Sequence, residues 1–330
     1  MRLCYNYSRK TGCGGVVVRN SAVFAALICA AFGFVSAQAD DCPALKRLAS
    51  IDLNMAAPFP LVPVEIAGAQ KLMVLAPGEP LSTLSEQTAA DLNLTPHMSK
   101  LMISQFGKSD QRMVMARMKL GNMNGASIRF LVDTDLRDHG MNGKVAGILA
   151  ADILSNFDVA IDFSTGKMDL FEHYQCAGKA VYWPHSTTVI VPFRRQITML
   201  PVPLQTMIVT PQLDGKPLTA IVDTSAVHST MSTATAANLF GIKSDAQTTV
   251  HKFRSLRFGE VSIPDPEIQI VSDTRPRDLT VTGSNIATRG SELNLVLGMD
   301  VLRQLHMYIA YRDEKLYLTP AGTAPAKATN

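Results

Sequence analysis

Hydrophobic and polar residues alternate over short segments of the chain, which is the pattern of half-buried β-strands. The clearest alternating segments are 112–120, 128–132, 254–258 and 268–271. Short Ser/Thr/Ala-rich stretches that end in leucine interrupt this pattern once in each half of the chain, and each predicts a small helix. The pattern therefore predicts a mainly β protein with few and short helices.

The two halves of the chain repeat each other. Residues 61–92 align without a gap to residues 208–239, an offset of 147. Residues 148–170 align in the same way to residues 296–318, an offset of 148. Two ungapped blocks at nearly one offset predict an internal duplication.

Each copy contains the same predicted order of elements. Two strands meet at a glycine turn, at Gly68 in the first copy and at Gly215 in the second. A second short helix is expected at 152–156 and again at 300–304, each followed by a closing hairpin. Both copies are therefore expected to fold alike.

One motif in the second copy contains candidate catalytic residues. The apolar segment 219–222 runs into Asp223-Thr224-Ser225, and a later apolar pair is followed by Gly298. This order resembles the lobes of retropepsin-like aspartic peptidases, which carry apolar-Asp-Thr-Gly and later apolar-apolar-Gly. The resemblance covers nearly the whole chain when both copies are counted, and it is greatest to bacterial exported proteins with two such lobes in one chain.

This resemblance implies two tandem retropepsin-like β-barrel lobes, related by a pseudo-two-fold in a bilobal, pepsin-like arrangement. It also implies an aspartic endopeptidase in which Asp223 is catalytic, supported by Thr224, Ser225 and Gly298. Such enzymes use two carboxylates about 3 Å apart that share a proton, one acting as acid and the other as base toward a water.

The first copy lacks the matching residues. The alignment places Ala76 on Asp223, Pro77 on Thr224, Gly78 on Ser225 and Ala150 on Gly298. One carboxylate in a single chain cannot form the shared-proton pair, so two functions stay open. The chain is an endopeptidase whose second carboxylate comes from another chain in a homodimer, or a non-catalytic peptide-binding pseudoprotease of the cell envelope. An extended peptide or protein is the expected partner in both.

A second Asp-Thr pair, Asp133-Thr134, also follows an apolar strand. Its counterpart in the second copy, Asp273-Thr274, comes long after that copy's own motif. We therefore interpret Asp133 as a strand end rather than a catalytic aspartate.

The first 39 residues predict a cleaved secretory signal peptide, with an uncleaved anchor as the alternative. Four basic residues precede an apolar run at 22–35 that is short for a membrane span, and the run leads to Ala37-Gln38-Ala39. The predicted location is periplasmic or secreted, with no stable membrane span after cleavage. The predicted organisation is a signal peptide at 1–39, a degenerate first lobe at 40–175, a linker at 176–199, a second lobe at 200–319 and a flexible tail at 320–330.

Removal of the signal peptide changes the charge and the cysteine content. It carries four of the 31 Lys and Arg residues and none of the 28 Asp and Glu residues, so the remainder has 27 basic and 28 acidic side chains. This near-neutral chain does not favour nucleic-acid binding. The cysteines that remain are Cys42 and Cys176, which predict a disulfide, with two free thiols as the alternative. No CxxC or His-x-His pattern is present, so we expect no metal and no cofactor.

Overall fold

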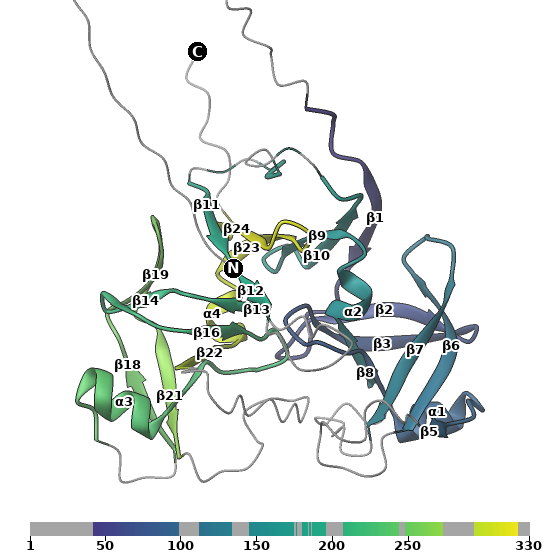
Figure 1. The fold of residues 1–330 in the computed structure, drawn as a ribbon, viewed down its shortest axis with the longest axis horizontal. Coiled ribbons are helices and arrows are strands. Elements are labelled where there is room, and N and C mark those ends of the chain that lie inside the picture. The colour runs from purple at the N-terminus through teal and green to yellow at the C-terminus, as the bar shows by residue number, and fades with distance from the viewer. Residues whose placement is uncertain are drawn as a thin grey trace, which may run out of the picture. The chain divides into compact units, whose positions relative to one another are not determined.

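The computed structural model describes residues 42–98, 112–133, 145–174, 176, 180–183, 185, 187–195, 207–243, 248–272 and 294–322 (Figure 1). The predicted signal peptide at 1–39 lies outside these residues, as do residues 323–330 of the predicted tail. Pro320, at the start of that tail, ends strand β24 (Lys315–Pro320). The described chain is mainly β with short helices, which confirms the predicted fold class at that level.

The strands of the first copy close into a barrel. In spatial order the sheet contains β2 (Leu61–Ile66), β3 (Ala69–Ala76), β8 (Val145–Ala150), β4 (Thr83–Ser85), β7 (Ala126–Asp133), β6 (Arg112–Leu120) and β5 (His97–Met98). Strand β2 also pairs with β6, with Val64 opposite Leu120, and this pairing closes the strands from β2 to β6.

The second copy repeats this strand order. In spatial order its main sheet contains β12 (Arg194–Arg195), β13 (Met207–Val209), β16 (Ala220–Val222), β22 (Leu295–Leu297), β17 (Thr230–Ser232), β21 (Glu267–Val271) and β18 (Thr248–Lys252). From β13 to β18 every neighbouring pair has the same parallel or antiparallel sense as its counterpart from β2 to β6. This agreement is what an internal duplication predicts.

The copies differ because the long strands of the first are interrupted in the second. A separate sheet contains β15 (Lys216–Pro217), β14 (Gln212–Leu213), β19 (Ser255–Phe258) and β20 (Val261–Pro264). Pro211 separates β13 from β14, and Pro266 separates β20 from β21. Proline has no N–H to donate to a sheet, so strands commonly end beside it.

A two-residue turn joins the first two strands of the first copy and recurs in the second. Its central residues are Ala67 and Gly68 in the first copy, with φ of +50° and +86°, and Asp214 and Gly215 in the second, with φ of +48° and +80°. Positive φ at both central positions is typical of a type I′ turn, which suits a hairpin and favours glycine. The predicted turns at Gly68 and Gly215 are therefore confirmed.

Each copy has one helix capped by a serine and one shorter helix. The helices are α1 (Glu86–Asp91), α2 (Ala151–Leu154), α3 (Thr233–Phe240) and α4 (Met299–Leu302). The side chain of Ser85 accepts a hydrogen bond from the N–H of Thr88 at the start of α1, and Ser232 does the same at the start of α3. These serines align in the repeat, so the cap explains why both helices begin at the same position.

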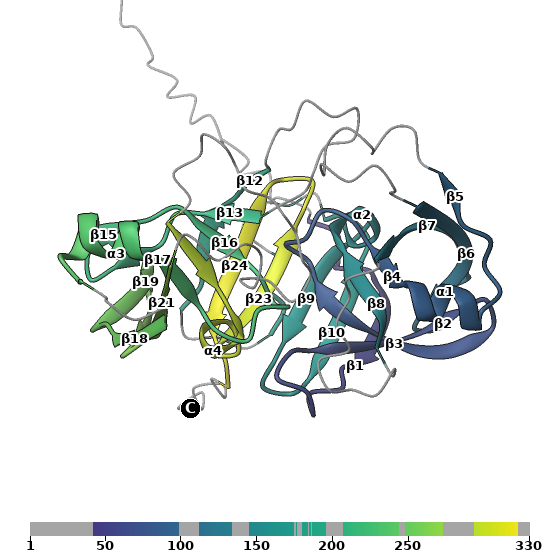
Figure 2. The same cartoon turned by 90° about the horizontal axis from the view of Figure 1, so that it is seen from below.

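The two copies meet in a shared antiparallel sheet (Figure 2). In spatial order it contains β1 (Arg47–Asp52), β10 (Lys167–Phe171), β9 (Asp158–Asp162), β23 (Leu305–Ala310), β24 and β11 (Val189–Pro192). The first copy supplies one half of this sheet and the second copy the other half. The closing hairpins predicted in both copies are confirmed as β9–β10 and β23–β24.

The register at the centre of the shared sheet relates the copies by a local two-fold. Ala160 on β9 lies opposite Tyr308 on β23, and Val159 lies opposite Ile309. The repeat offset of 148 carries Ala160 to position 308 and leaves that pair unchanged. Applied to the Val159–Ile309 pair, the offset adds 148 to the first position and subtracts 148 from the second, which gives 307 and 161. Met307 and Ile161 also form a pair, on the opposite side of the Ala160–Tyr308 pair. The two-fold therefore passes through the Ala160–Tyr308 pair.

The segment 176–199, predicted as a linker, contributes two strands to the fold. Strand β11 pairs with β24 at the edge of the shared sheet, where β1 pairs with β10 in the first copy. Strand β12 pairs with β13. These strands span only four and two residues, too few for an alternating pattern to identify.

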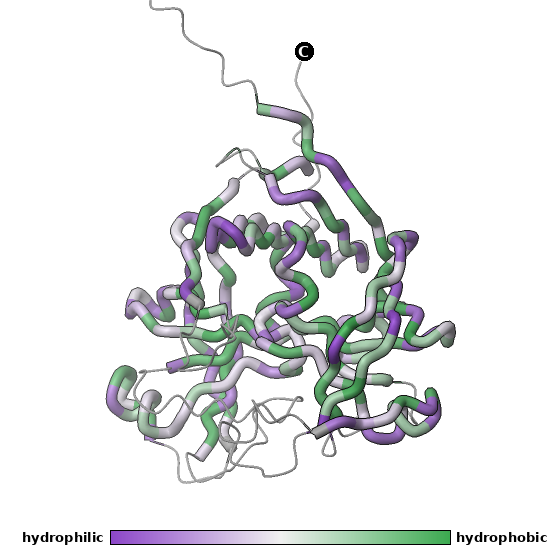
Figure 3. The backbone as a smooth tube through the Cα atoms, turned by 45° about the vertical axis from the view of Figure 1, so that its right-hand side comes forward, coloured by the Kyte–Doolittle hydropathy of each residue, from purple (hydrophilic) through white to green (hydrophobic). Residues whose placement is uncertain are grey.

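Buried and exposed side chains alternate along some strands, such as β6 and β20, whereas β8 is buried throughout. Hydrophobic and polar colours also alternate along parts of the tube in Figure 3. On β6, Val114, Ala116 and Met118 are buried, whereas Met115 and Arg117 between them are exposed. The alternation in the sequence therefore identified the buried face of this strand. None of the helices in the described ranges is long and apolar enough to cross a membrane.

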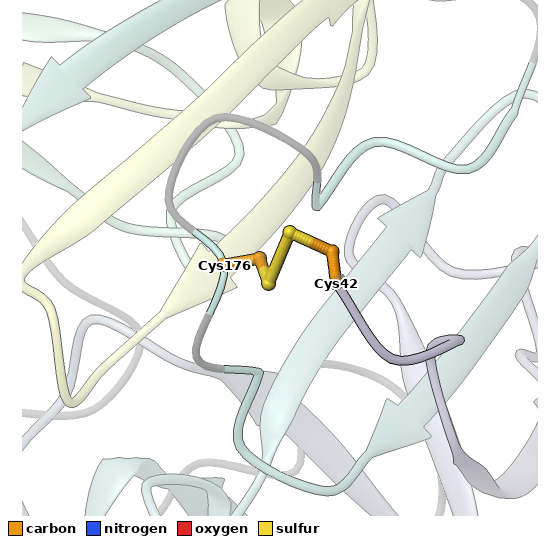
Figure 4. Close-up of a disulfide and its surroundings, with 2 residues drawn as sticks. All are labelled: Cys42 and Cys176. Carbon is orange, nitrogen blue, oxygen red and sulfur yellow. A yellow bond between two sulfur atoms is a disulfide. The ribbon is translucent and has the colours of Figure 1, made fainter. Parts of the chain in front are cut away.

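A disulfide joins Cys42, before β1, to Cys176, after β10 (Figure 4). Their Cα atoms are 5.9 Å apart, and 134 positions separate them in the sequence. The predicted pairing is confirmed. Disulfides persist mainly outside the reducing cytoplasm, so the bond is compatible with a non-cytoplasmic location.

We expect the double substitution Cys42→Ala, Cys176→Ala to lower the free energy of unfolding by about 2–4 kcal/mol, because the crosslink restricts a long loop of the unfolded chain. Urea denaturation without reductant measures the change. A reductant should lower the midpoint of the wild-type protein and leave the double variant unchanged. Equal midpoints for both proteins without reductant would contradict the prediction.

Candidate functional site

Asp223 lies directly after β16, at the point where this strand meets β22. Val222 lies opposite Leu297, and the N–H of Asp223 donates to the carbonyl oxygen of Leu297 at 3.0 Å. In the first copy Ala76 ends β3 opposite Ala150 on β8. The structure thus places Ala76 at the position equivalent to Asp223, as the sequence alignment did.

The carboxyl of Asp223 is buried and only partly hydrogen-bonded. The residue is 1% exposed. Oδ1 accepts hydrogen bonds from the N–H of Ser225 at 2.9 Å and from its hydroxyl. Oδ2 is buried and has no hydrogen-bond partner among the described residues.

This environment raises the pKa of Asp223. Burial is the main cause and disfavours the charged form, whereas hydrogen bonds from Ser225 and from the N–H of Ala226 act in the opposite direction. Burial therefore favours the neutral form of this carboxyl over its charged form.

Thr224 connects the two copies. Its hydroxyl donates to the carbonyl oxygen of Leu75, the residue before Ala76. Both this threonine and Leu75 are 0% exposed. The hydrogen bond therefore ties the loop that holds Asp223 to the equivalent loop of the first copy.

A second hydrogen bond from the second copy reaches the same loop of the first copy. Pro77, which aligns with Thr224, has no hydroxyl, and its carbonyl oxygen accepts a hydrogen bond from the hydroxyl of Tyr311 at 2.9 Å. Phe163 aligns with Tyr311 in the repeat and has no hydroxyl to offer. Thr224 and Tyr311, both from the second copy, thus each donate a hydrogen bond to the loop of the first copy.

Two glycines allow the backbone to pack closely at the site. A Cβ atom on Gly78 would lie 1.9 Å from the carbonyl oxygen of Val222, so no side chain fits where the two loops meet. A Cβ atom on Gly298 would lie 2.5 Å from the carbonyl carbon of His228. The equivalent Ala150 is 0% exposed and carries its methyl group in the core. The backbones of Gly78 and Gly298 therefore pack too closely against Val222 and His228 for a side chain to fit.

A serine–aspartate contact beneath each loop was missed by sequence reasoning. The hydroxyl of Ser229 donates to Asp300 at 2.6 Å and accepts a hydrogen bond from the N–H of Gly298. In the first copy Ser82 donates to Asp152 at 2.6 Å. Both residues are identical at aligned positions of the two copies, which was the available signal. Because the first copy retains them without the aspartate motif, they support the loop whether or not an aspartate is present.

Asp133 is not at the position of the missing aspartate. It ends β7, which pairs in parallel with β4, with Asp133 opposite Ser85. The strand order is β3-β8-β4-β7, so two strands separate Asp133 from the strand that ends at Ala76. The interpretation of Asp133 as a strand end agrees with this placement.

In comparisons with known proteins, the chain matches no protein-family model and no curated protein sequence. Within the part of the chain that the structure describes, no group of three or more His, Cys, Asp or Glu side chains is placed to hold a metal ion. The interpretation of the site therefore rests on the contacts of Asp223, Thr224 and Gly78.

We expect Asp223→Asn to change the pH dependence of stability. Because burial raises the pKa of Asp223 above its ordinary value of 3.8, the folded state binds more protons than the unfolded state above that pH. Wild-type stability should therefore carry a contribution that is complete below pH 3.8 and is lost as the pH rises through the folded pKa. The asparagine variant lacks it, so its stability relative to wild type should increase with pH. Thermal unfolding over a pH series measures this, and a difference that does not vary with pH would contradict it.

We expect Thr224→Val to lower the free energy of unfolding by about 1–3 kcal/mol, because the buried carbonyl of Leu75 loses its donor. Thr224→Ser keeps a hydroxyl at that position and should retain most of the stability. Urea denaturation of the three proteins distinguishes these outcomes. Equal losses in the valine and serine variants would show that packing, and not the hydrogen bond, is what Thr224 contributes.

Proposed function

We propose that the chain is an aspartic endopeptidase built from two retropepsin-like lobes, and that it cuts extended peptides or proteins in the periplasm or outside the cell. The observation that carries this proposal is the buried carboxyl of Asp223, on a loop that Thr224 ties to the equivalent loop of the other copy. A carboxyl with a raised pKa at the junction of two related units suits proton transfer during peptide hydrolysis.

The architecture supports the same proposal. The first copy forms a closed barrel, the second repeats its strand order, and the two share a sheet with a local two-fold. A bilobal, pepsin-like arrangement has these features, and it brings one loop from each lobe to the axis. Here the contact of Gly78 with the backbone of Val222 and the bond from Thr224 to Leu75 bring the two loops together.

The chemistry of this class explains what Asp223 would do. One carboxylate takes a proton from a water molecule while a protonated carboxyl donates to the peptide carbonyl oxygen. Ser225 orients Asp223 through Oδ1 and leaves Oδ2 for the reacting groups. Since Asp223 is 1% exposed, the residues that cover it must move before a peptide reaches it.

A second candidate function is peptide binding without cleavage. The observation that favours it is that Ala76 and Pro77 stand where a catalytic aspartate and its threonine would be. In that case the chain would hold an extended peptide by strand pairing, as a pseudoprotease of the cell envelope.

Incubation of the purified protein with unfolded protein substrates between pH 4 and 6 separates the two functions. We expect cleavage that a statine-type inhibitor blocks, and a loss of about 10²-fold or more in kcat/KM for Asp223→Asn, since general acid–base catalysis contributes at least that much. The exposed Asp313→Asn serves as the matched control and should retain wild-type activity. Peptide binding without cleavage would establish the second function and exclude the first.

A further inference from the structure

Glu79 occupies the loop of the first copy that matches the Asp223 loop. Its N–H donates to the carbonyl oxygen of Ala76 at 3.0 Å, and its carbonyl oxygen accepts from the first residue of α2 at 2.9 Å. In the second copy the N–H of Ala226 donates to the carbonyl oxygen of Asp223 at 3.3 Å, and its carbonyl accepts from the first residue of α4 at 2.8 Å. Glu79 and Ala226 therefore hold equivalent positions.

That position adjoins the place of the carboxyl group. In the second copy the N–H of Ala226 contributes to lowering the pKa of Asp223, so this residue lies beside the carboxylate. In the first copy Ala76 offers only a methyl group at the equivalent place. The backbone of Glu79 lies beside the position of Ala76, and Glu79 carries a carboxyl on a flexible side chain. Glu79 can therefore supply the first copy with the carboxyl group that Ala76 lacks.

The burial of Glu79 fits such a role. The residue is 8% exposed, although glutamate is rarely buried without a specific reason. Gly78, the residue before it, packs against the backbone of Val222, and Leu75 accepts the hydrogen bond from Thr224. The Glu79 loop thus lies directly against the loop of the buried aspartate.

We propose that Glu79 is the second carboxyl of the site and shares one proton with Asp223. This inference rests on the proposed function and completes the pair within one chain, without a homodimer. The Oδ2 atom of Asp223 is buried and has no hydrogen-bond partner among the described residues, Glu79 included, so the sharing requires the side chain of Glu79 to approach this atom.

The reaction balances with one water and one shared proton. The ionised carboxyl takes a proton from water as the oxygen bonds to the peptide carbonyl carbon, and the protonated carboxyl donates its proton to the carbonyl oxygen. The intermediate then loses a proton from one hydroxyl as the carbon–nitrogen bond breaks, and the amine receives a proton. The pair ends with one proton, as it began, and the products are a carboxylic acid and an amine.

The first test uses Glu79→Gln in the full chain and does not depend on activity. Carbon-13 labelling of aspartate and NMR titration report the midpoint of Asp223, which Asp223→Asn assigns. Removal of a neighbouring carboxylate should move this midpoint to lower pH by about one unit or more, because like charges raise each other's pKa. Glu65→Gln is the matched control: Glu65 belongs to the same copy, pairs with Lys119 at 2.7 Å and should leave the midpoint unchanged. An unchanged midpoint in Glu79→Gln would overturn the proposal.

The second test measures cleavage and separates this inference from the proposed function. We expect Glu79→Gln to lower kcat by about 10²-fold or more, with no further loss in the double variant with Asp223→Asn. Glu79→Asp keeps the charge on a shorter side chain and should retain part of the activity. Cleavage that needs Asp223 but not Glu79 would overturn the inference and leave the function intact. A shifted Asp223 midpoint without cleavage would support the pair and reject the peptidase.

Discussion

The pairing of β9 with β23 is the interaction on which the position of the site depends. A shift of one residue between these strands would turn every side chain to the opposite face and destroy the local two-fold. The hydroxyl of Tyr308, at the centre of the pairing, donates to Asp158 at 3.0 Å, and the same carboxylate accepts from the N–H of Tyr174. Both Tyr308 and Asp158 are at most 1% exposed, so a wrong register would leave buried polar groups without partners. The register that satisfies them also brings the loops of Ala76 and Asp223 together.

Comparison of the two loops shows which features the fold requires. The first copy retains the contact between Ser82 and Asp152 beneath the loop, which matches the contact between Ser229 and Asp300 in the second. It lacks the aspartate and the threonine, and its loop still closes with the same backbone hydrogen bond as the second. The carboxyl is therefore not needed to form the loop. The contact between the copies is also uneven, since the hydroxyls of Thr224 and Tyr311 both belong to the second copy and both donate to carbonyl oxygens of the first.

The alternating pattern and the repeat predicted most of the strands, the turns at Gly68 and Gly215 and the short helices, because these depend on local preferences and on one buried face. They did not predict the division of the second copy into two sheets, which follows from prolines at the strand breaks, or the strands inside 176–199. The hydrogen bond from Thr224 to Leu75 joins residues far apart in sequence, and no local pattern reports it. Glu79 was missed for a related reason: the alignment sets it against Ala226, and burial of a glutamate is visible only in the folded chain.

The cost of burying Asp223 bears on whether the site is used. A buried carboxyl with one oxygen lacking a hydrogen-bond partner among the described residues destabilises the folded state, and the first copy demonstrates that alanine fits the equivalent position. A chain that needed only the fold could relieve this cost by the same substitution in the second copy. Residues that lower the stability of a protein are concentrated at functional sites, and so are carboxyl groups with a shifted pKa. Folding alone therefore does not account for the carboxyl of Asp223, and this agrees with the proposed function.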